Sequence, residues 1–113
     1  MKHVGVVPIE ALAGDALALL EYAPHHVLVA LVNGVPCAIE DSCSHAGASL
    51  ATGHRHGFIV ACPLHAYRFD LRTGELLSPR RACAHQRRFE AVVVGDMVHV
   101  YDPFTLVVSP VLP

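Results

Sequence analysis

The chain of 113 residues is long enough for one compact domain and too short for two ordinary ones. Its formal net charge of −2 gives no basis for binding nucleic acid or an acidic membrane surface. The sequence has no apolar run near the roughly 20 residues that span a bilayer, and its start lacks the pattern of a signal peptide. We therefore expect a single domain over residues 1–113, located in the cytoplasm, with neither nucleic acid nor membrane as a partner.

The first segment with a recognisable pattern, residues 9–22, is rich in Ala, Leu and Glu, which favour a helix. Gly14-Asp15 interrupts this segment, and a helix that crossed the glycine would be weakened. We predict a short helical turn at residues 9–13 and a strand at about residues 16–22.

Two hairpins are predicted from short apolar runs on either side of tight turns. Residues 27–32 and 35–39 flank Asn33-Gly34, a dipeptide that strongly favours a two-residue turn between strands. A second hairpin of the same kind is predicted at residues 89–94 and 97–101, around Gly95-Asp96.

Frequent turns between short strands, including a β-rich run at residues 58–61, indicate the fold class. They predict an all-β fold, an antiparallel sandwich or barrel. The tail, about residues 102–113, carries three prolines. We expect this tail to be extended and to pack over the body of the protein or over a partner.

The sequence contains nine histidines and four cysteines, Cys37, Cys43, Cys62 and Cys83. An even number of cysteines can form disulfides, but a cytoplasmic compartment keeps thiols reduced. The chain is also large enough to fold without covalent links. Free thiols or metal ligands are therefore the better interpretation.

Two short segments each carry one Cys followed closely by one His. The first reads Cys43-Ser44-His45-Ala46-Gly47, and the second reads Cys62-Pro63-Leu64-His65. Turn residues beside both segments predict loops, and two facing loops would bring two thiols and two imidazoles together. These ligand types suit zinc as well as an iron–sulfur cluster, so by themselves they leave the metal open.

The spacing of these motifs, and the residues around them, closely resembles the Rieske ferredoxin family. Residues 62–71, followed by Thr73-Gly74-Glu75, resemble that family's second cluster loop and the strand after it. Residues 43–50, followed by Gly53, resemble its first loop. A weaker resemblance runs from about residue 4 to residue 101. The resemblance implies a Rieske-type fold, in which two loops within about residues 42–70 form a cluster-binding subdomain.

The resemblance also implies one [2Fe–2S] cluster per chain, with its inner iron held by Cys43 and Cys62 and its outer iron held by His45 and His65. Two ferric ions, two sulfides and two thiolates carry no net charge when both histidines are neutral. Four thiolates would instead make the site a dianion. Because an electron enters a neutral site more readily, histidine ligation raises the reduction potential.

The same resemblance indicates the end of the Rieske range at which this potential lies. High-potential relatives have an extra Cys in each loop, where this chain has Ala48 and Leu64, so the disulfide they form is excluded. In those relatives, two residues donate hydrogen bonds from their hydroxyl groups to the cluster sulfurs. The matching positions here are Tyr67 and Phe69, and the phenyl ring of Phe69 cannot donate a hydrogen bond. Fewer donors stabilise the reduced cluster less, so we predict a potential of roughly −150 mV to around zero.

One position departs from the family. Ala66 follows the second His, where the family usually has Gly. A left-handed backbone at Ala66 would therefore carry a small strain.

Several other polar residues are interpreted as structural or solvent-exposed rather than functional. Cys37 lies in a predicted strand as a buried thiol, and Cys83 lies outside both motifs. His54 and His56 are placed in a solvated turn between the loops, and His25-His26 in another turn. Arg80-Arg81 and Arg87-Arg88 form a basic stretch, for which a solvated surface is favoured over docking against an acidic partner.

We predict an electron carrier that is not itself an enzyme. It would pass one electron at a time from a flavoprotein reductase to a terminal oxygenase, typically of an aromatic-ring dioxygenase system. The sequence shows no pattern for a catalytic base, a nucleophile or a mononuclear iron site. Two alternatives are a small Rieske subunit of a larger reductase, such as nitrite reductase, and a structural zinc domain for protein interaction.

Overall fold

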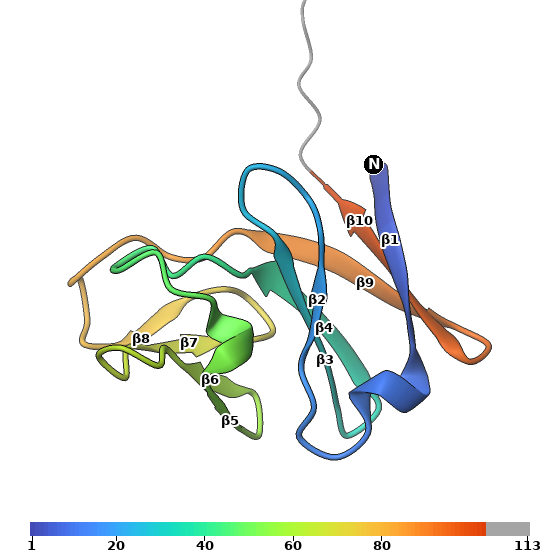
Figure 1. The fold of residues 1–113 in the computed structure, drawn as a ribbon, viewed down its shortest axis with the longest axis horizontal. Helices are drawn as coiled ribbons and strands as arrows, with labels where there is room; N and C mark the ends of the chain where they lie inside the picture. The colour runs from blue at the N-terminus through green and yellow to red at the C-terminus, as the bar shows by residue number, and fades with distance from the viewer. Residues whose placement is uncertain (104–113) are drawn as a thin grey trace, which may run out of the picture.

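The computed structural model describes residues 1–103, and over these residues the predicted all-β fold is confirmed (Figure 1). Their elements are β1 (Lys2–Pro8), the 3-10 helix η1 (Ile9–Leu12), β2 (Ala18–Leu20), β3 (Val27–Val32), β4 (Val35–Glu40), the 3-10 helix η2 (Leu50–Thr52), β5 (His54–His56), β6 (Ile59–Ala61), β7 (Arg68–Asp70), β8 (Leu76–Ser78), β9 (Arg88–Val94) and β10 (Met97–Asp102). The part of the predicted tail at residues 104–113 lies outside the described residues. Neither helix of the described chain is long and apolar enough to cross a membrane.

Six strands form one antiparallel sheet in the order β1-β10-β9-β4-β3-β2, and β5-β6-β7-β8 form a smaller antiparallel sheet beside it (Figure 1). The edge strands β1 and β2 approach each other. A Cβ atom at Gly5 would lie only 3.2 Å from Cδ2 of Leu20. The large sheet is therefore nearly closed, like a barrel, with the small sheet packed outside it.

The predicted hairpins are confirmed. Val32 pairs with Val35 across Asn33-Gly34, and both turn residues have positive φ angles of 52° and 79°, as a tight hairpin turn requires. In the second hairpin, Val94 pairs with Met97 across Gly95-Asp96. The helical turn and the strand expected after it are η1 and β2, although β2 is shorter than predicted.

One local prediction is wrong. His54 and His56 are not in a turn but in strand β5, which pairs with β6. The turn of that hairpin is at Gly57-Phe58. The three residues of β5 have large polar side chains and show no strand pattern of their own. Pairing with the apolar strand β6 imposes their extended conformation.

Strand β3 is buried on both faces, which explains its uninterrupted apolar sequence. Its odd-numbered residues Val27 and Val29 face the barrel core, together with Leu12, Phe89, Val98 and Val100. Leu28, Ala30 and Val32 face a second core with Cys37, Ile39, Cys43, Leu50, Val60, Cys62, Phe69, Leu71 and Leu76. The second core thus joins the barrel to the small sheet and to both predicted loops.

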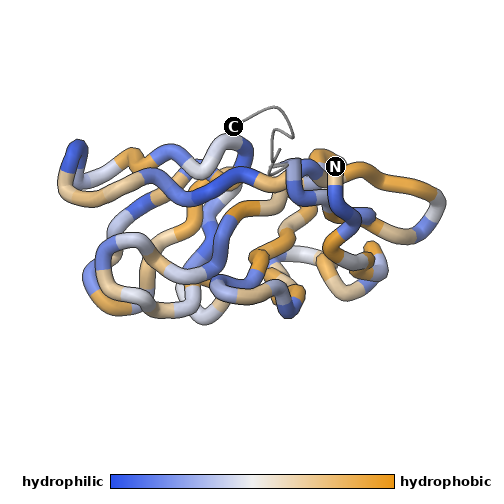
Figure 2. Tube along the Cα trace, turned by 90° about the horizontal axis from the view of Figure 1, so that it is seen from above, coloured by the Kyte–Doolittle hydropathy of each residue, from blue (hydrophilic) through white to orange (hydrophobic). Residues whose placement is uncertain are grey.

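The hydropathy of the chain follows this arrangement. In Figure 2 the hydrophobic colour also extends into the β9–β10 hairpin, at the right end of the molecule, where Val92 and Val94 are exposed.

Cys37 is 3% exposed within the second core, and this burial raises the pKa of its thiol to about 11. Its interpretation as a buried thiol is confirmed.

Candidate metal centre

The two Cys–His segments are loops at the edge of the second core. The first follows β4, and the second connects β6 to β7. Cys43 and Cys62 are each 2% exposed, whereas His45 and His65 are exposed to solvent. Each loop therefore turns its cysteine inward and its histidine outward.

Both loops are closed by the same pair of backbone hydrogen bonds. The N–H of Cys43 donates to the carbonyl of Ala48 at 2.8 Å, and the N–H of Gly47 donates back to the carbonyl of Cys43 at 2.7 Å. In the second loop, Cys62 donates to Tyr67 at 2.8 Å and accepts from Ala66 at 3.0 Å. In both cases the partners are the residues four and five positions after the cysteine.

The shared design requires a left-handed residue at the same position of each loop. Gly47 has a φ angle of 74°, and Ala66 has a φ angle of 57°. The left-handed backbone expected at Ala66 is confirmed. It costs roughly 1–2 kcal/mol for a residue with a Cβ atom, a strain that Gly47 avoids in the first loop.

The two buried thiols meet between the loops. Burial raises the pKa of the Cys43 thiol, and a hydrogen bond with the Cys62 thiol raises it further. The backbone N–H groups of Ala46 and His45 point at the Cys43 sulfur and act in the opposite direction. These N–H groups would stabilise a thiolate at Cys43 once a metal replaces its proton.

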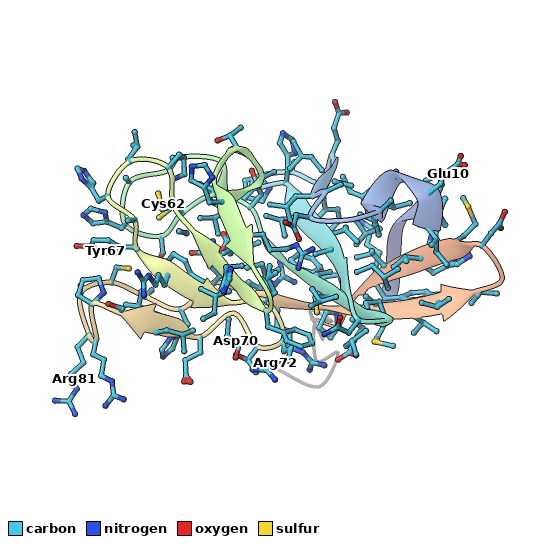
Figure 3. All side chains as sticks on the ribbon, turned by 90° about the horizontal axis from the view of Figure 1, so that it is seen from below. Glu10, Cys62, Tyr67, Asp70, Arg72 and Arg81 are labelled. Carbon is cyan, nitrogen blue, oxygen red and sulfur yellow. The ribbon has the colours of Figure 1, made fainter. Side chains whose placement is uncertain are left out.

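The two imidazoles lie together on the outer side. The ring centroids of His45 and His65 are 5.0 Å apart, with the rings inclined by 65°. The Tyr67 ring stacks on His45 with a centroid distance of 3.9 Å and an angle of 10°. Figure 3 shows Tyr67 and Cys62 at the same end of the molecule. The structure thus brings the four residues singled out in the sequence together as two pairs, Cys43 with Cys62 inside and His45 with His65 outside.

This arrangement of donors fits a group with two metal atoms. The thiols form one pair inside, and the imidazoles form another pair at the surface. Within residues 1–103, no three His, Cys, Asp or Glu side chains are gathered closely enough to hold a single ion. A [2Fe–2S] cluster of the Rieske kind needs two thiolates on one iron and two imidazoles on the other, and the inner thiol pair and the outer imidazole pair supply these two kinds of ligand.

Gln86, which the sequence did not single out, supports the first loop from behind. Its side-chain oxygen accepts from the N–H of Ser44 at 2.8 Å, and its amide nitrogen donates to the carbonyls of Glu40 at 2.8 Å and Ser42 at 2.7 Å. The side chain is only 3% exposed. Gly74 allows the close approach of this segment, because a Cβ atom there would lie 2.1 Å from the carbonyl oxygen of Gln86.

Cys83 lies in the same supporting segment as Gln86 and is only half-buried, unlike Cys43 and Cys62. Its sulfur is 3.3 Å from the hydroxyl oxygen of Ser44, which is also 2.5 Å from the carbonyl oxygen of Ala84. Cys83 is half-buried against the second core. These contacts agree with its interpretation as a structural residue.

Known proteins match this chain over most of its length. A family model described as the Rieske [2Fe–2S] domain matches residues 3–90. The ferredoxin component of biphenyl 2,3-dioxygenase from Rhodococcus jostii is 36% identical over 89 residues, which cover 79% of this chain and 82% of that protein.

Solved structures agree in fold. The ferredoxin of carbazole 1,9a-dioxygenase from Nocardioides aromaticivorans superimposes with a TM-score of 0.80 and 29% identity, covering 89% of this chain and 98% of that one. A ferredoxin solved in a complex with the oxygenase of carbazole 1,9a-dioxygenase gives a TM-score of 0.81 and 25% identity, covering 92% of this chain and 96% of that one.

Proposed function

This chain belongs to the Rieske [2Fe–2S] domain family, and from this premise we propose that it is the ferredoxin component of an aromatic-ring dioxygenase or similar oxygenase system. It is an electron carrier and not itself an enzyme, like the ferredoxin components to which it is similar. It would take one electron at a time from a flavoprotein reductase and deliver it to the terminal oxygenase. The observation that carries the proposal is the pair of buried thiols beneath a pair of exposed imidazoles.

The four side chains have separate tasks in this proposal. Cys43 and Cys62 would hold the inner iron as thiolates, and His45 and His65 would hold the outer iron through their rings. The bound cluster supplies reversible one-electron exchange. The buried cysteines keep the inner sulfurs away from water, while the exposed rings leave a short path to a partner.

Residues around the loops would set the geometry and the potential. The ring of Tyr67, stacked on His45, restricts the rotation of that imidazole. Phe69 is fully buried and has no group that donates a hydrogen bond. Because donors to the sulfurs stabilise the reduced cluster, we propose a potential of roughly −150 mV to around zero.

The family assignment bears on the alternatives and on the setting. A structural zinc domain has no support from the comparisons, in which the curated relatives are ferredoxin components. We propose that the whole chain, residues 1–113, acts as one Rieske domain. We propose the cytoplasm as its compartment, because the ligand cysteines must stay reduced until the cluster is assembled.

The direct test is an assay of iron and acid-labile sulfide on the purified protein, together with its visible and electron paramagnetic resonance (EPR) spectra. We expect about two irons and two sulfides per chain and a red-brown colour. In the reduced state we expect an EPR signal of low average g. Zinc without acid-labile sulfide would refute the proposal.

A variant tests the role of one ligand. His65→Cys adds a negative charge to the site and should lower the reduction potential. Cys37→Ala is the cysteine control, since its thiol belongs to β4 and contacts the carbonyl of Val35 rather than belonging to either loop, so its loss should leave the EPR signal unchanged. An unaltered potential in His65→Cys would show that His65 is not a ligand.

A further inference from the structure

Acidic residues are absent from the part of the chain that forms the metal centre. The sequence contains 10 acidic residues, yet none lies between Asp41 and Asp70. This interval includes both Cys–His loops and the strands β5 and β6 between them. The negative charge that gives the chain its net −2 therefore comes from other parts of the sequence.

The arginines divide into two groups by their partners. Four of them form ion pairs: Arg55 with Asp15, Arg72 with Asp70, Arg87 with Asp102, and Arg88 with Glu90. The other three, Arg68, Arg80 and Arg81, are exposed and form no ion pair within residues 1–103. Within the described residues, no carboxylate lies within ion-pair distance of these three guanidinium groups.

The unpaired arginines gather at the end of the molecule that carries the metal centre. Arg68 directly follows the second loop and pairs with Ser78 across β7 and β8, and Arg80 and Arg81 come shortly after Ser78. Figure 3 shows Arg81 at the same end as Cys62 and Tyr67, with its side chain directed away from the body. The backbone of Arg81 is left-handed, with a φ angle of 63°.

A shallow groove runs beside the two neighbouring arginines. Arg80, Arg81 and His85 line it together with Leu76 and Leu77, and Glu75 is the single carboxylate at its edge. The groove thus offers cationic and apolar contacts side by side. Such a combination suits an acidic side chain flanked by apolar residues.

The second loop itself exposes an apolar side chain. Leu64 is 59% exposed and precedes His65 in the second loop. A single exposed leucine is common on protein surfaces, so Leu64 contributes here because it lies next to His65 in the second loop. Leu64, Arg68, Arg80 and Arg81, with the exposed rings of His45 and His65, are called the docking face below.

We propose that the docking face binds a carboxylate-rich surface of a redox partner protein, with the arginines paired to its acidic residues and Leu64 in an apolar contact beside the metal centre. This inference rests on the proposed function and deepens it by naming the chemistry of the partner. Charges more than about 10 Å apart are largely screened at 0.1 M ionic strength, so the local charge of the face outweighs the net charge of the chain. A partner selected by net charge alone would instead be cationic.

Two outer-sphere oxidants of opposite charge test the sign of this face. Each takes one electron from the reduced protein: hexacyanoferrate(III) becomes hexacyanoferrate(II), and hexaamminecobalt(III) becomes aqueous cobalt(II) with release of its six ammonia ligands to the solvent. In stopped-flow experiments, the rate constant with the anionic oxidant should fall by roughly ten-fold as ionic strength rises from about 10 mM to about 200 mM. The rate constant with the cationic oxidant should rise over the same interval.

A carboxylate-rich polymer tests binding at the same face. Poly-L-glutamate should slow oxidation by hexacyanoferrate(III), because it competes for the arginines, and poly-L-lysine should not. The variant Arg80→Glu/Arg81→Glu should lose this inhibition and should react roughly ten-fold more slowly with the anion at low ionic strength.

Arg81→Glu and Lys2→Glu form a matched pair, because each changes the net charge by the same amount. Lys2 lies in β1, at the opposite side of the large sheet from β4 and the first loop. Equal effects of the two variants, or a hexacyanoferrate(III) rate that rises with ionic strength, would overturn the inference. Visible and EPR spectra of each variant separate the two claims, since loss of the cluster spectrum in the parent protein contradicts the proposed function, whereas an intact cluster without charge selectivity contradicts only the docking face.

Discussion

Gln86→Leu should destabilise the first loop strongly, although residue 86 contacts neither of the proposed ligands in that loop. The side chain serves three backbone groups at once: the N–H of Ser44 and the carbonyls of Glu40 and Ser42. A leucine of similar size fills the space but satisfies none of them. A typical hydrogen bond contributes about 1 kcal/mol net, and a buried group left without a partner costs more, so we expect a loss of about 3 kcal/mol in the free energy of unfolding.

The effect should appear both in stability and in retention of the cluster. Urea unfolding followed by far-ultraviolet circular dichroism gives the change in the free energy of unfolding, provided that the slope against urea is unchanged. The three groups flank Cys43 on both sides, so the visible absorbance of the cluster should also bleach faster under a chelator in Gln86→Leu.

Gln86→Glu is the control for this reasoning. A carboxylate can still accept from the N–H of Ser44 but cannot donate to the two carbonyls, so its loss of stability should lie close to that of Gln86→Leu or exceed it. The structural role of this glutamine would be refuted if Gln86→Leu had a free energy of unfolding within about 1 kcal/mol of the parent value and its cluster bleached at the same rate.

Three further predictions concern the loops and the second core. Gly47→Ala should destabilise the protein by roughly 1–2 kcal/mol, whereas Ala66→Gly should be neutral or stabilising by up to about 1 kcal/mol; thermal unfolding of both would show whether the two loops share one strained position. Tyr67→Ala should speed chelator-induced loss of the cluster by freeing the His45 ring, while Tyr67→Phe, which keeps the stacked ring, should match the parent. Because the pKa of Cys37 is raised from 9.0 to about 11 in the folded state, its contribution to stability is complete below pH 9 and is lost as pH rises towards 11. The free energy of unfolding, measured with urea, should therefore fall less steeply between pH 9 and 11 in Cys37→Val than in the parent.

The parts of the fold that could be predicted from the sequence are those with local signals. The hairpin of β3 and β4 follows from Asn33-Gly34, whose left-handed conformations fix the turn regardless of the rest of the chain. The two Cys–His segments are similarly local, since each loop is closed by residues within five positions of its cysteine. The strain at Ala66 could be anticipated only because the family usually has Gly at that position.

The parts that could not be predicted depend on contacts between distant segments. Gln86 lies far along the chain from Ser44, and a lone glutamine among polar residues gives no sign that it will be buried. The stacking of Tyr67 on His45 joins the two loops and has no counterpart in either motif alone. The strand at His54 and His56 likewise depends on the pairing of β5 with β6, which the polar residues themselves do not encode.

The two loops share a pattern of backbone hydrogen bonds but place their histidines at different positions, and this difference makes the docking face asymmetric. His45 lies two positions after its cysteine, whereas Leu64 occupies the same position in the second loop and His65 comes one residue later. The exposed leucine therefore belongs to the second loop only, and Arg68 follows that loop directly. A surface on which the apolar contact and an unpaired charge both come from the second loop and its neighbouring strand can orient a partner as well as attract it. Since a productive transfer of one electron depends on a short path from the exposed rings, we expect orientation by Leu64 and the arginines to raise the rate in addition to their attraction for the partner.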